Sequence, residues 1–337
     1  MVRELRIISL ASAAALAVSA ASAQESVKLR IAHQFPQSHY LWEEGGKVFV
    51  DNLSAGGAKV SMSVFPAAQL GKDPLAVLQS GLADIVTLVP SYSPEKMPLT
   101  SVAELPGFHN TTCEGVHKLW TIIKDGAPLE VAEYKPLGIH VLFVAHQPAY
   151  KILTSKKQVS KIGDVSGLKI RANGASIGNL VRSVGGVPIS MTSGEVYDAT
   201  SRGTIDGTLL PYYTLPIYGL SDVVKYVYEG PAFGGGPVIY AMTDKAWQRL
   251  SDEMKASFIK AAADAQEKLC TYQDQLEDTD RQKAVDAGKI TITTADKNDL
   301  AEWQKKFDEV AVKWAEGMER QGRPGQQILG AFKVTQN

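Results

Sequence analysis

Cysteine is scarce in this sequence: the 337 residues contain only Cys113 and Cys270. Small secreted proteins that depend on disulfides for stability carry a higher density of cysteines, so this chain is not a disulfide scaffold. Both cysteines precede or lie within segments that look helical. A mutual disulfide and two buried free thiols are both compatible with the sequence, which leaves the pairing open.

An excess of charge of one sign is also missing. Lysine and arginine together number 35, and aspartate and glutamate 36, which gives a formal net charge of −1. Proteins that bind nucleic acid or anionic membrane surfaces electrostatically carry a marked positive excess. We therefore expect no nucleic-acid partner.

Long apolar runs are absent beyond the N-terminus, and the run there is short. It extends from Ile7 to Val18, follows an arginine-containing start and precedes Ala21-Ser22-Ala23. A membrane-spanning helix needs about 20 apolar residues, whereas this layout is typical of a secretory signal peptide. We expect residues 1–23 to be cleaved on export, which leaves an exported protein that starts at Gln24 and does not insert into the membrane.

Histidine is absent from the second half of the chain, and this limits the enzymes that the sequence could encode. Gly174 to Gly178 matches the G-x-S-x-G pattern around the nucleophilic serine of α/β hydrolases, which makes Ser176 a candidate nucleophile. In that fold the catalytic histidine follows the serine, but all six histidines precede Ser176. We expect Ser176 to cap a helix instead, and a secreted hydrolase is the least favoured alternative.

Signatures of metal and cofactor binding are missing as well. The sequence has no H-x-x-x-H or C-x-x-C pair, which are common spacings of zinc ligands. Gly234-Gly235-Gly236 lacks the strand–turn–helix context of a dinucleotide-binding loop and has no Walker lysine. We expect no catalytic residues, no metal and no cofactor, and hence no enzyme.

Two stretches of the chain alternate between strand-like and helical patterns, as in parallel sheets covered by helices. The first begins at Val27, and the second starts after Lys161. A long amphipathic helical run follows from Lys245 to about Gly288, with a break or bend near Thr279, and Asp296 caps a last helix. The sequence therefore predicts an α/β protein of two lobes, each a mixed, mostly parallel sheet flanked by helices, with long C-terminal helices.

These patterns also set the expected domain bounds. Residues 24–148 and about 236–275 form the first lobe, residues 149–235 form the second, and about 276–337 form C-terminal helices that pack across the lobes. Loops at the carboxyl ends of the strands then meet in a cleft, the usual position of a small-molecule site in such sheets.

Four segments carry a recognisable pattern: VFPAAQLGKDPLAVLQSGLADI, PLTSVAELPGF, GDVSGLKIRANG and GGVPISMTSGEVYDATSRGTIDG. In this order and spacing they resemble the solute-binding proteins of TRAP transporters, the dicarboxylate-type periplasmic receptors. The resemblance runs over essentially the whole chain after residue 23. It implies a two-lobed periplasmic-binding-protein fold that closes on a small organic acid and delivers it to the membrane subunits of the transporter. An ABC-type periplasmic binding protein for a small anion is the nearest alternative.

The resemblance implies that Arg171, at the end of the LKIR strand, pairs with the ligand carboxylate. A guanidinium matches a carboxylate with two parallel hydrogen bonds. The small residues from Ala172 to Gly174 would let the ligand come close. Sialic-acid-type members carry a second arginine at a position that corresponds here to Lys151, beside Tyr150, and either residue could replace it.

Other positions at which these receptors hold polar ligands are apolar in this sequence. Leu210 stands where sialic-acid-type members have an asparagine, and Val89 occupies a third polar position. Tyr92, Tyr212 and Phe233 are expected nearby. Because a buried site rejects polar groups that it cannot satisfy, we expect a monocarboxylate with an apolar or aromatic body, or a keto or hydroxy acid, rather than a sugar acid.

Three further ligand contacts are candidates. Gln34 and Phe35 lie in the loop HQFPQSHY that follows the first strand. Asn173 could contact the ligand or hold its own turn. Asp73 and Glu195 are expected chiefly as helix-capping residues.

Overall fold

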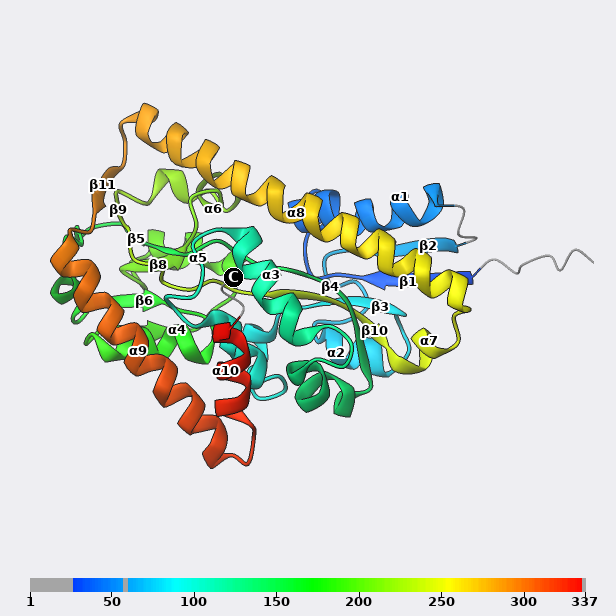
Figure 1. The fold of residues 1–337 in the computed structure, drawn as a ribbon. Coiled ribbons are helices and arrows are strands. Elements are labelled where there is room, and N and C mark those ends of the chain that lie inside the picture. The colour runs from blue at the N-terminus through cyan, green and yellow to red at the C-terminus, as the bar shows by residue number, and fades with distance from the viewer. Residues whose placement is uncertain (1–26, 57–59, 335–337) are drawn as a thin grey trace, which may run out of the picture.

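The structure is a computed structural model that describes residues 27–56 and 60–334. The predicted signal peptide lies outside these residues. The strands form two sheets that lie next to each other in the molecule, with helices around both and long helices along the outside (Figure 1). The predicted α/β architecture of two mixed sheets is therefore confirmed.

The first sheet has five strands in the order β2-β1-β3-β10-β4. Its strands are β1 (Val27–Ala32), β2 (Val60–Phe65), β3 (Ile85–Leu88), β4 (Ile139–Ala145) and β10 (Val238–Thr243). Strands β1, β2 and β3 run parallel, and β10 runs antiparallel to β3 and β4. Every residue of β3 is buried, because helices cover both faces: α1 (Lys47–Ala55) and α8 (Asp252–Ala287) on one, α2 (Pro74–Gln79) and α3 (Thr112–Ile123) on the other.

The second sheet has six strands in the order β11-β9-β5-β8-β6-β7. Its strands are β5 (Lys151–Thr154), β6 (Lys169–Arg171), β7 (Val187–Ile189), β8 (Gly207–Leu210), β9 (Tyr226–Glu229) and β11 (Thr291–Thr294). Strand β6 runs parallel to β7 and β8. The short helices of this half are α4 (Ala175–Ser183), α5 (Val196–Ser201) and α6 (Thr214–Ile217).

The predicted bend near Thr279 is wrong. After α7 (Asp244–Gln248), helix α8 (Asp252–Ala287) runs unbroken for 36 residues, because its sequence contains no glycine or proline that would interrupt it. The interruption falls earlier, at Ser251, whose side chain accepts a hydrogen bond from the backbone N–H of Met254 and starts the helix. In Figure 1, α8 passes along both sheets.

The last two helices are α9 (Lys297–Arg320) and α10 (Gly325–Val334). Asp296 caps α9 as expected, since it accepts a hydrogen bond from the N–H of Asp299. Helix α9 packs on α4 of the second half, and the indole N–H of Trp314 donates to Ser101 Oγ in the first half. This helix therefore contacts both halves.

The strands divide the chain between the halves. Those of the first sheet fall within residues 27–145 and 238–243, and those of the second within 151–229 and 291–294. The precise domain bounds remain a prediction.

The two cysteines form a disulfide. Cys113 at the start of α3 is bonded to Cys270 in α8, and their Cα atoms lie 4.9 Å apart. The question that the sequence left open is thus answered: the bond joins two helices that are 157 residues apart in the chain.

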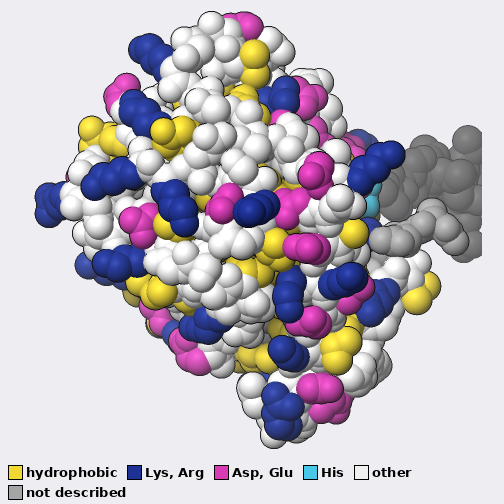
Figure 2. Space-filling view, turned by 90° about the vertical axis from the view of Figure 1, so that its left-hand side faces the viewer, with side chains coloured by type: hydrophobic (Ala, Val, Ile, Leu, Met, Phe, Trp, Pro, Cys, Tyr) yellow, Lys and Arg dark blue, Asp and Glu magenta, His cyan; other side chains and the backbone are white. Residues whose placement is uncertain are grey.

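The surface carries both signs of charge. Figure 2 shows lysine and arginine side chains interspersed with aspartate and glutamate over the face that carries α9. Among residues 27–56 and 60–334, no helix is long and apolar enough to cross a membrane.

Candidate functional site

A cavity of about 700 Å³ lies between the two halves of the molecule. Its lining includes the predicted contacts Gln34, Phe35 and Tyr92 from the first half, and Thr192, Ser193, Gly194, Ile217 and Tyr218 from the second. His39 Nε2 lies 3.4 Å from Tyr218 Oη and so connects the two walls. Both sheets therefore present loops to one cleft.

Arg171 lies behind this lining, at the end of β6, and is 3% exposed. Its Nε donates to the carbonyl oxygen of Met191, and Nη2 donates to Ser193 Oγ, each at 3.2 Å. No carboxylate of the described chain lies within ion-pair distance of the guanidinium. A buried cation that is held only by neutral groups favours an anion from outside.

The charge of Arg171 acts on two phenol groups, those of Tyr150 and Tyr218. Burial, opposed by the charge of Arg171, raises the pKa of Tyr150 well above its usual range. Burial also raises the pKa of Tyr218 to about 12, with Tyr92 contributing in the same direction and Arg171 opposing it. The phenols of Tyr150 and Tyr218 therefore stay protonated at neutral pH and can donate hydrogen bonds to a bound anion.

Further aromatic rings continue from the cleft wall into the first half. Phe35 stacks on His39 with ring centroids 4.6 Å apart, and His39 lies 4.4 Å from Tyr40. Tyr40 meets Tyr213 of the second half edge-on at 5.4 Å, and their hydroxyl oxygens are 3.4 Å apart. Burial lowers the pKa of His39 to about 4, and His33 adds to this, so this wall is uncharged.

Sequence reasoning missed these rings. His39, Tyr40, Tyr213 and Tyr218 were not among the predicted contacts, although two of them stand in the same loop as Gln34. The signal was available in the density of aromatic residues after the first strand, HQFPQSHYLW. The sequence does not show which of these rings point toward the cleft, because the loop has no regular periodicity.

Lys151, the suggested counterpart of a second arginine, has an internal partner. Its Nζ lies 2.6 Å from Oε1 of Glu277 in α8, and it also donates to the carbonyl oxygen of Ala149. The ammonium lies 5.7 Å from the ring of Tyr212. Glu277 thus neutralises Lys151 within the protein, in contrast to Arg171.

Three predicted contacts lie in the hydrophobic core rather than in the cavity lining. Leu210 and Tyr212 belong to the core of the second half, and Tyr212 Oη donates to Glu229. Phe233 packs edge-on against Trp303 with ring centroids 4.7 Å apart.

Asn173 holds its own turn. Its Oδ1 accepts hydrogen bonds from Ser190 Oγ and from the N–H of Met191. Since the carbonyl group of Met191 accepts from Arg171, Asn173 helps to fix the loop that orients the guanidinium.

The predicted capping roles of Asp73 and Glu195 are confirmed. Asp73 Oδ1 accepts from the N–H of Ala76 at the start of α2. Glu195 forms a capping box with Thr192. The N–H of Ala76 and that of Thr192 are thereby satisfied, and neither carboxylate has an unexplained position.

The prediction that Ser176 caps α4 is wrong. Gly174 occupies the cap position with φ +86°, a conformation that favours glycine. Ser176 instead donates from Oγ to the carbonyl oxygen of Ser101, 2.8 Å away in the first half. Its hydroxyl is fully buried and links the halves, which is no setting for a nucleophile.

The space beside Gly174 is occupied by Glu104. A Cβ atom at Gly174 would lie 2.0 Å from Oε2 of this glutamate. Glu104 is buried, and burial raises its pKa to about 8. The small residues after Arg171 therefore make room for a neutral carboxyl group of the protein itself.

Comparison with known proteins places the chain in a family. Residues 31–317 match the model of bacterial extracellular solute-binding protein family 7. The chain is 26% identical over 264 residues to a solute-binding protein of Roseobacter denitrificans, covering 75% of this chain and 77% of that protein. It is 23% identical over 329 residues to the C4-dicarboxylate-binding periplasmic protein DctP of Rhodobacter capsulatus, covering 96% and 95%.

Solved structures of TRAP solute-binding proteins have the same fold as this chain. A TRAP solute-binding protein from Rhodoferax ferrireducens T118, in complex with copurified benzoate, superposes with a TM-score of 0.81 at 25% identity, covering 92% of this chain and 97% of that one. A TRAP periplasmic solute-binding protein from Bordetella bronchiseptica with bound mandelate has the same fold, with a TM-score of 0.81 at 22% identity, covering 92% and 98%. This chain belongs to bacterial extracellular solute-binding protein family 7, the solute-binding proteins of TRAP transporters.

Proposed function

We propose that this protein is a periplasmic receptor that captures a small monocarboxylic acid with an aromatic body and delivers it to the membrane subunits of a TRAP transporter. This proposal rests on the buried Arg171, which has no carboxylate partner in the described chain. The phenols of Tyr150 and Tyr218, on which its charge acts, are neutral. Residues 1–23 would direct export and be cleaved in the process.

The aromatic wall supports the choice of ligand body. Phe35, His39 and Tyr218 offer ring faces and one hydroxyl group within the cleft, and burial keeps His39 neutral. A planar apolar body gains from contact with such rings, whereas a sugar acid would leave several hydroxyls unpaired. Benzoate and mandelate, which bind structurally similar proteins, are the first acids to test.

The contacts divide into two sets under this proposal. Arg171, with Tyr150 beside it, holds the carboxylate. Gln34, Phe35 and Tyr92 surround the body of the acid.

The test is calorimetric titration of ligand-free protein with benzoate, mandelate, pyroglutamate, succinate and galacturonate. We expect the aromatic acids to bind most tightly and Arg171→Met to weaken binding at least about 30-fold, because removing one partner of a buried charge pair costs about 2 kcal/mol or more. Arg182→Met, at an exposed arginine of α4, is the matched control and should bind as the wild type does.

Either of two results would contradict the proposal. Unchanged affinity in Arg171→Met would remove the carboxylate assignment. Preferential binding of succinate or galacturonate would leave a receptor, but with a different ligand class.

A further inference from the structure

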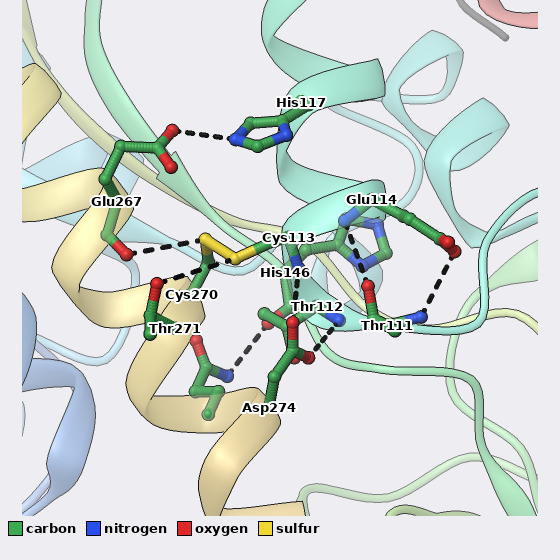
Figure 3. The surroundings of a disulfide bond; sticks show 11 residues. Thr111, Thr112, Cys113, Glu114, His117, His146, Glu267, Cys270, Thr271 and Asp274 are labelled. Atoms are coloured by element: carbon green, nitrogen blue, oxygen red, sulfur yellow. Dashed lines mark hydrogen bonds and ion pairs between the residues drawn. A yellow bond between two sulfur atoms is a disulfide. The ribbon is translucent and has the colours of Figure 1, made fainter.

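Three side chains that can bind metals, Cys113, Glu267 and Cys270, meet where α3 and α8 face each other, and His117 adjoins them through Glu267. Cys113 and His117 lie one turn apart on α3, and Glu267 and Cys270 lie one turn apart on α8. Spacings of four and three residues place each pair on one face of its helix. Figure 3 shows Glu267 extending toward His117 beside the disulfide.

The donor atoms of this cluster are close together. Sγ of Cys113, Sγ of Cys270 and a carboxylate oxygen of Glu267 all lie within 4.8 Å of one another. Nε2 of His117 lies 2.7 Å from Oε1 of Glu267. The sulfur atoms are bonded to each other, so the cluster offers a nitrogen and an oxygen donor but no thiolate in this state.

We propose that reduction of the Cys113–Cys270 disulfide creates a zinc site, with the two thiolates, the Glu267 carboxylate and the His117 imidazole as ligands. Two sulfurs, one nitrogen and one oxygen form a four-coordinate donor set that suits Zn²⁺. This site is separate from the ligand cleft and does not depend on the proposed transport function.

The chemistry is a two-electron step followed by metal binding. A dithiol reductant supplies two electrons and two protons, the S–S bond breaks, and the dithiol itself becomes a disulfide. Zn²⁺ then displaces the protons of the two thiols. With Zn–S bonds of about 2.3 Å, the ion would lie between sulfur atoms that have moved apart.

The cluster is open to solvent, and α3 and α8 are also held together by a contact other than the disulfide. The side chains of His117 and Glu267 are each 56% exposed, so reductant and metal can approach from solvent. Asp274 accepts hydrogen bonds from the N–H groups of Thr112 and Cys113. It therefore ties the start of α3 to α8 by a contact that does not involve the disulfide, and the four donors remain together after reduction.

The experiment uses the full-length mature protein, folded with its disulfide intact. One sample is then reduced with a phosphine, which is oxidised to the phosphine oxide with oxygen from water, and the other is left oxidised. Both are titrated with Zn²⁺ against a chromophoric chelator and, in parallel, with Co²⁺, whose thiolate charge-transfer absorption reports sulfur ligation. We expect one ion per reduced chain, with the cobalt–thiolate absorption, and no such binding to the oxidised chain.

Variants separate the four-ligand site from a bare thiol pair. Glu267→Gln and His117→Ala keep both cysteines, so they fold with the disulfide and are reduced afterwards. Each should bind zinc at least about 10-fold more weakly than the reduced wild type, while Glu253→Gln, elsewhere on α8, should not differ from it.

Two outcomes would overturn the proposal. Reduced wild type that takes up no zinc excludes the site, whether or not its near-UV circular dichroism shows that the fold persists. Equal affinity in Glu267→Gln, His117→Ala and the wild type would exclude these two ligands.

Discussion

Three ionisable residues near the cleft, Lys151, Glu104 and Arg171, differ in whether they carry a charge without a charged partner. Lys151 is neutralised by Glu277, and Glu104 is neutral because burial raises its pKa to about 8. Arg171 alone of these three remains charged with only neutral partners. Since an ionised Glu104 would add a second negative charge near an anionic ligand, its protonated state leaves the charge of Arg171 available to the ligand.

The buried state of Glu104 predicts a pH-dependent stability. Its pKa is about 8 in the folded protein and near 4.5 when exposed, so between these values the folded state binds one more proton than the unfolded state. Stability from this group is therefore present at low pH and is lost as pH rises through that window, by up to about 1.4 kcal/mol per pH unit. Urea unfolding of wild type and Glu104→Gln at pH 5, 6, 7 and 8 measures the difference.

We expect the wild type to lose stability relative to Glu104→Gln as pH increases. Glu302→Gln, at an exposed position of α9, should follow the wild type. Parallel stability curves for wild type and Glu104→Gln would show that Glu104 does not titrate differently on folding.

At the scale of elements, α8 connects parts of the molecule that are far apart in the chain. Cys270 bonds it to α3, Gln266 accepts from the N–H of Val144 in β4, and Glu277 pairs with Lys151 in β5. Both sheets are thus attached to one continuous helix, whose lack of glycine and proline keeps it unbroken.

The ion pair between Lys151 in β5 and Glu277 in α8 is expected to contribute to stability. Lys151→Met should lower the free energy of unfolding by about 3 kcal/mol, because Glu277, only 10% exposed, would keep a charge without a partner. Lys151→Met/Glu277→Leu should recover much of the loss. Chemical denaturation measures both, with Lys260→Met, which breaks the exposed Lys260–Asp264 pair on the same helix, as the control.

Ligand titration of Lys151→Met adds a functional readout. If Lys151 pairs with Glu277 of α8 and does not contact the ligand, the affinity of the folded variant for the best-binding acid should change little. A loss comparable to that of Arg171→Met would instead make Lys151 a ligand contact.

For the whole molecule, the important contacts are those that cross the cleft. Tyr218 Oη of the second half lies 3.4 Å from His39 Nε2 of the first. The hydroxyl oxygens of Tyr213 and Tyr40 are also 3.4 Å apart. In a receptor that closes on its ligand, bonds formed only in the closed state stabilise that state and so increase affinity.

Tyr218→Phe should therefore weaken ligand binding by about 2- to 10-fold, the value of one hydrogen bond of 0.5–1.5 kcal/mol. Calorimetric titration gives the affinity, and small-angle scattering with and without ligand follows closure. Tyr197→Phe, at a tyrosine that is 40% exposed, should bind as the wild type does. Wild-type affinity in Tyr218→Phe would mean that this contact does not couple closure to binding.

The sequence by itself determined the periodic and local features. Alternating strand and helix patterns predicted the two α/β halves, capping sequences predicted the roles of Asp73, Glu195 and Asp296, and ordered motifs indicated the family and Arg171. These features depend on residues close together in the chain, whose spacing decides which face they share. The predicted bend near Thr279 was wrong because α8 has no glycine or proline to interrupt it. The predicted cap at Ser176 was wrong because its hydroxyl donates to the carbonyl oxygen of Ser101 in the other half instead.

Only the tertiary structure decided which groups meet across long separations in the chain. It paired Cys113 with Cys270, gave Lys151 its partner Glu277, and buried Leu210, Tyr212 and Phe233 in cores rather than in the cleft lining. No local pattern contains this information, because burial and charge pairing depend on how the elements pack. The physical reason is that a side chain's environment, unlike its helix or strand periodicity, is set by residues far away in the sequence.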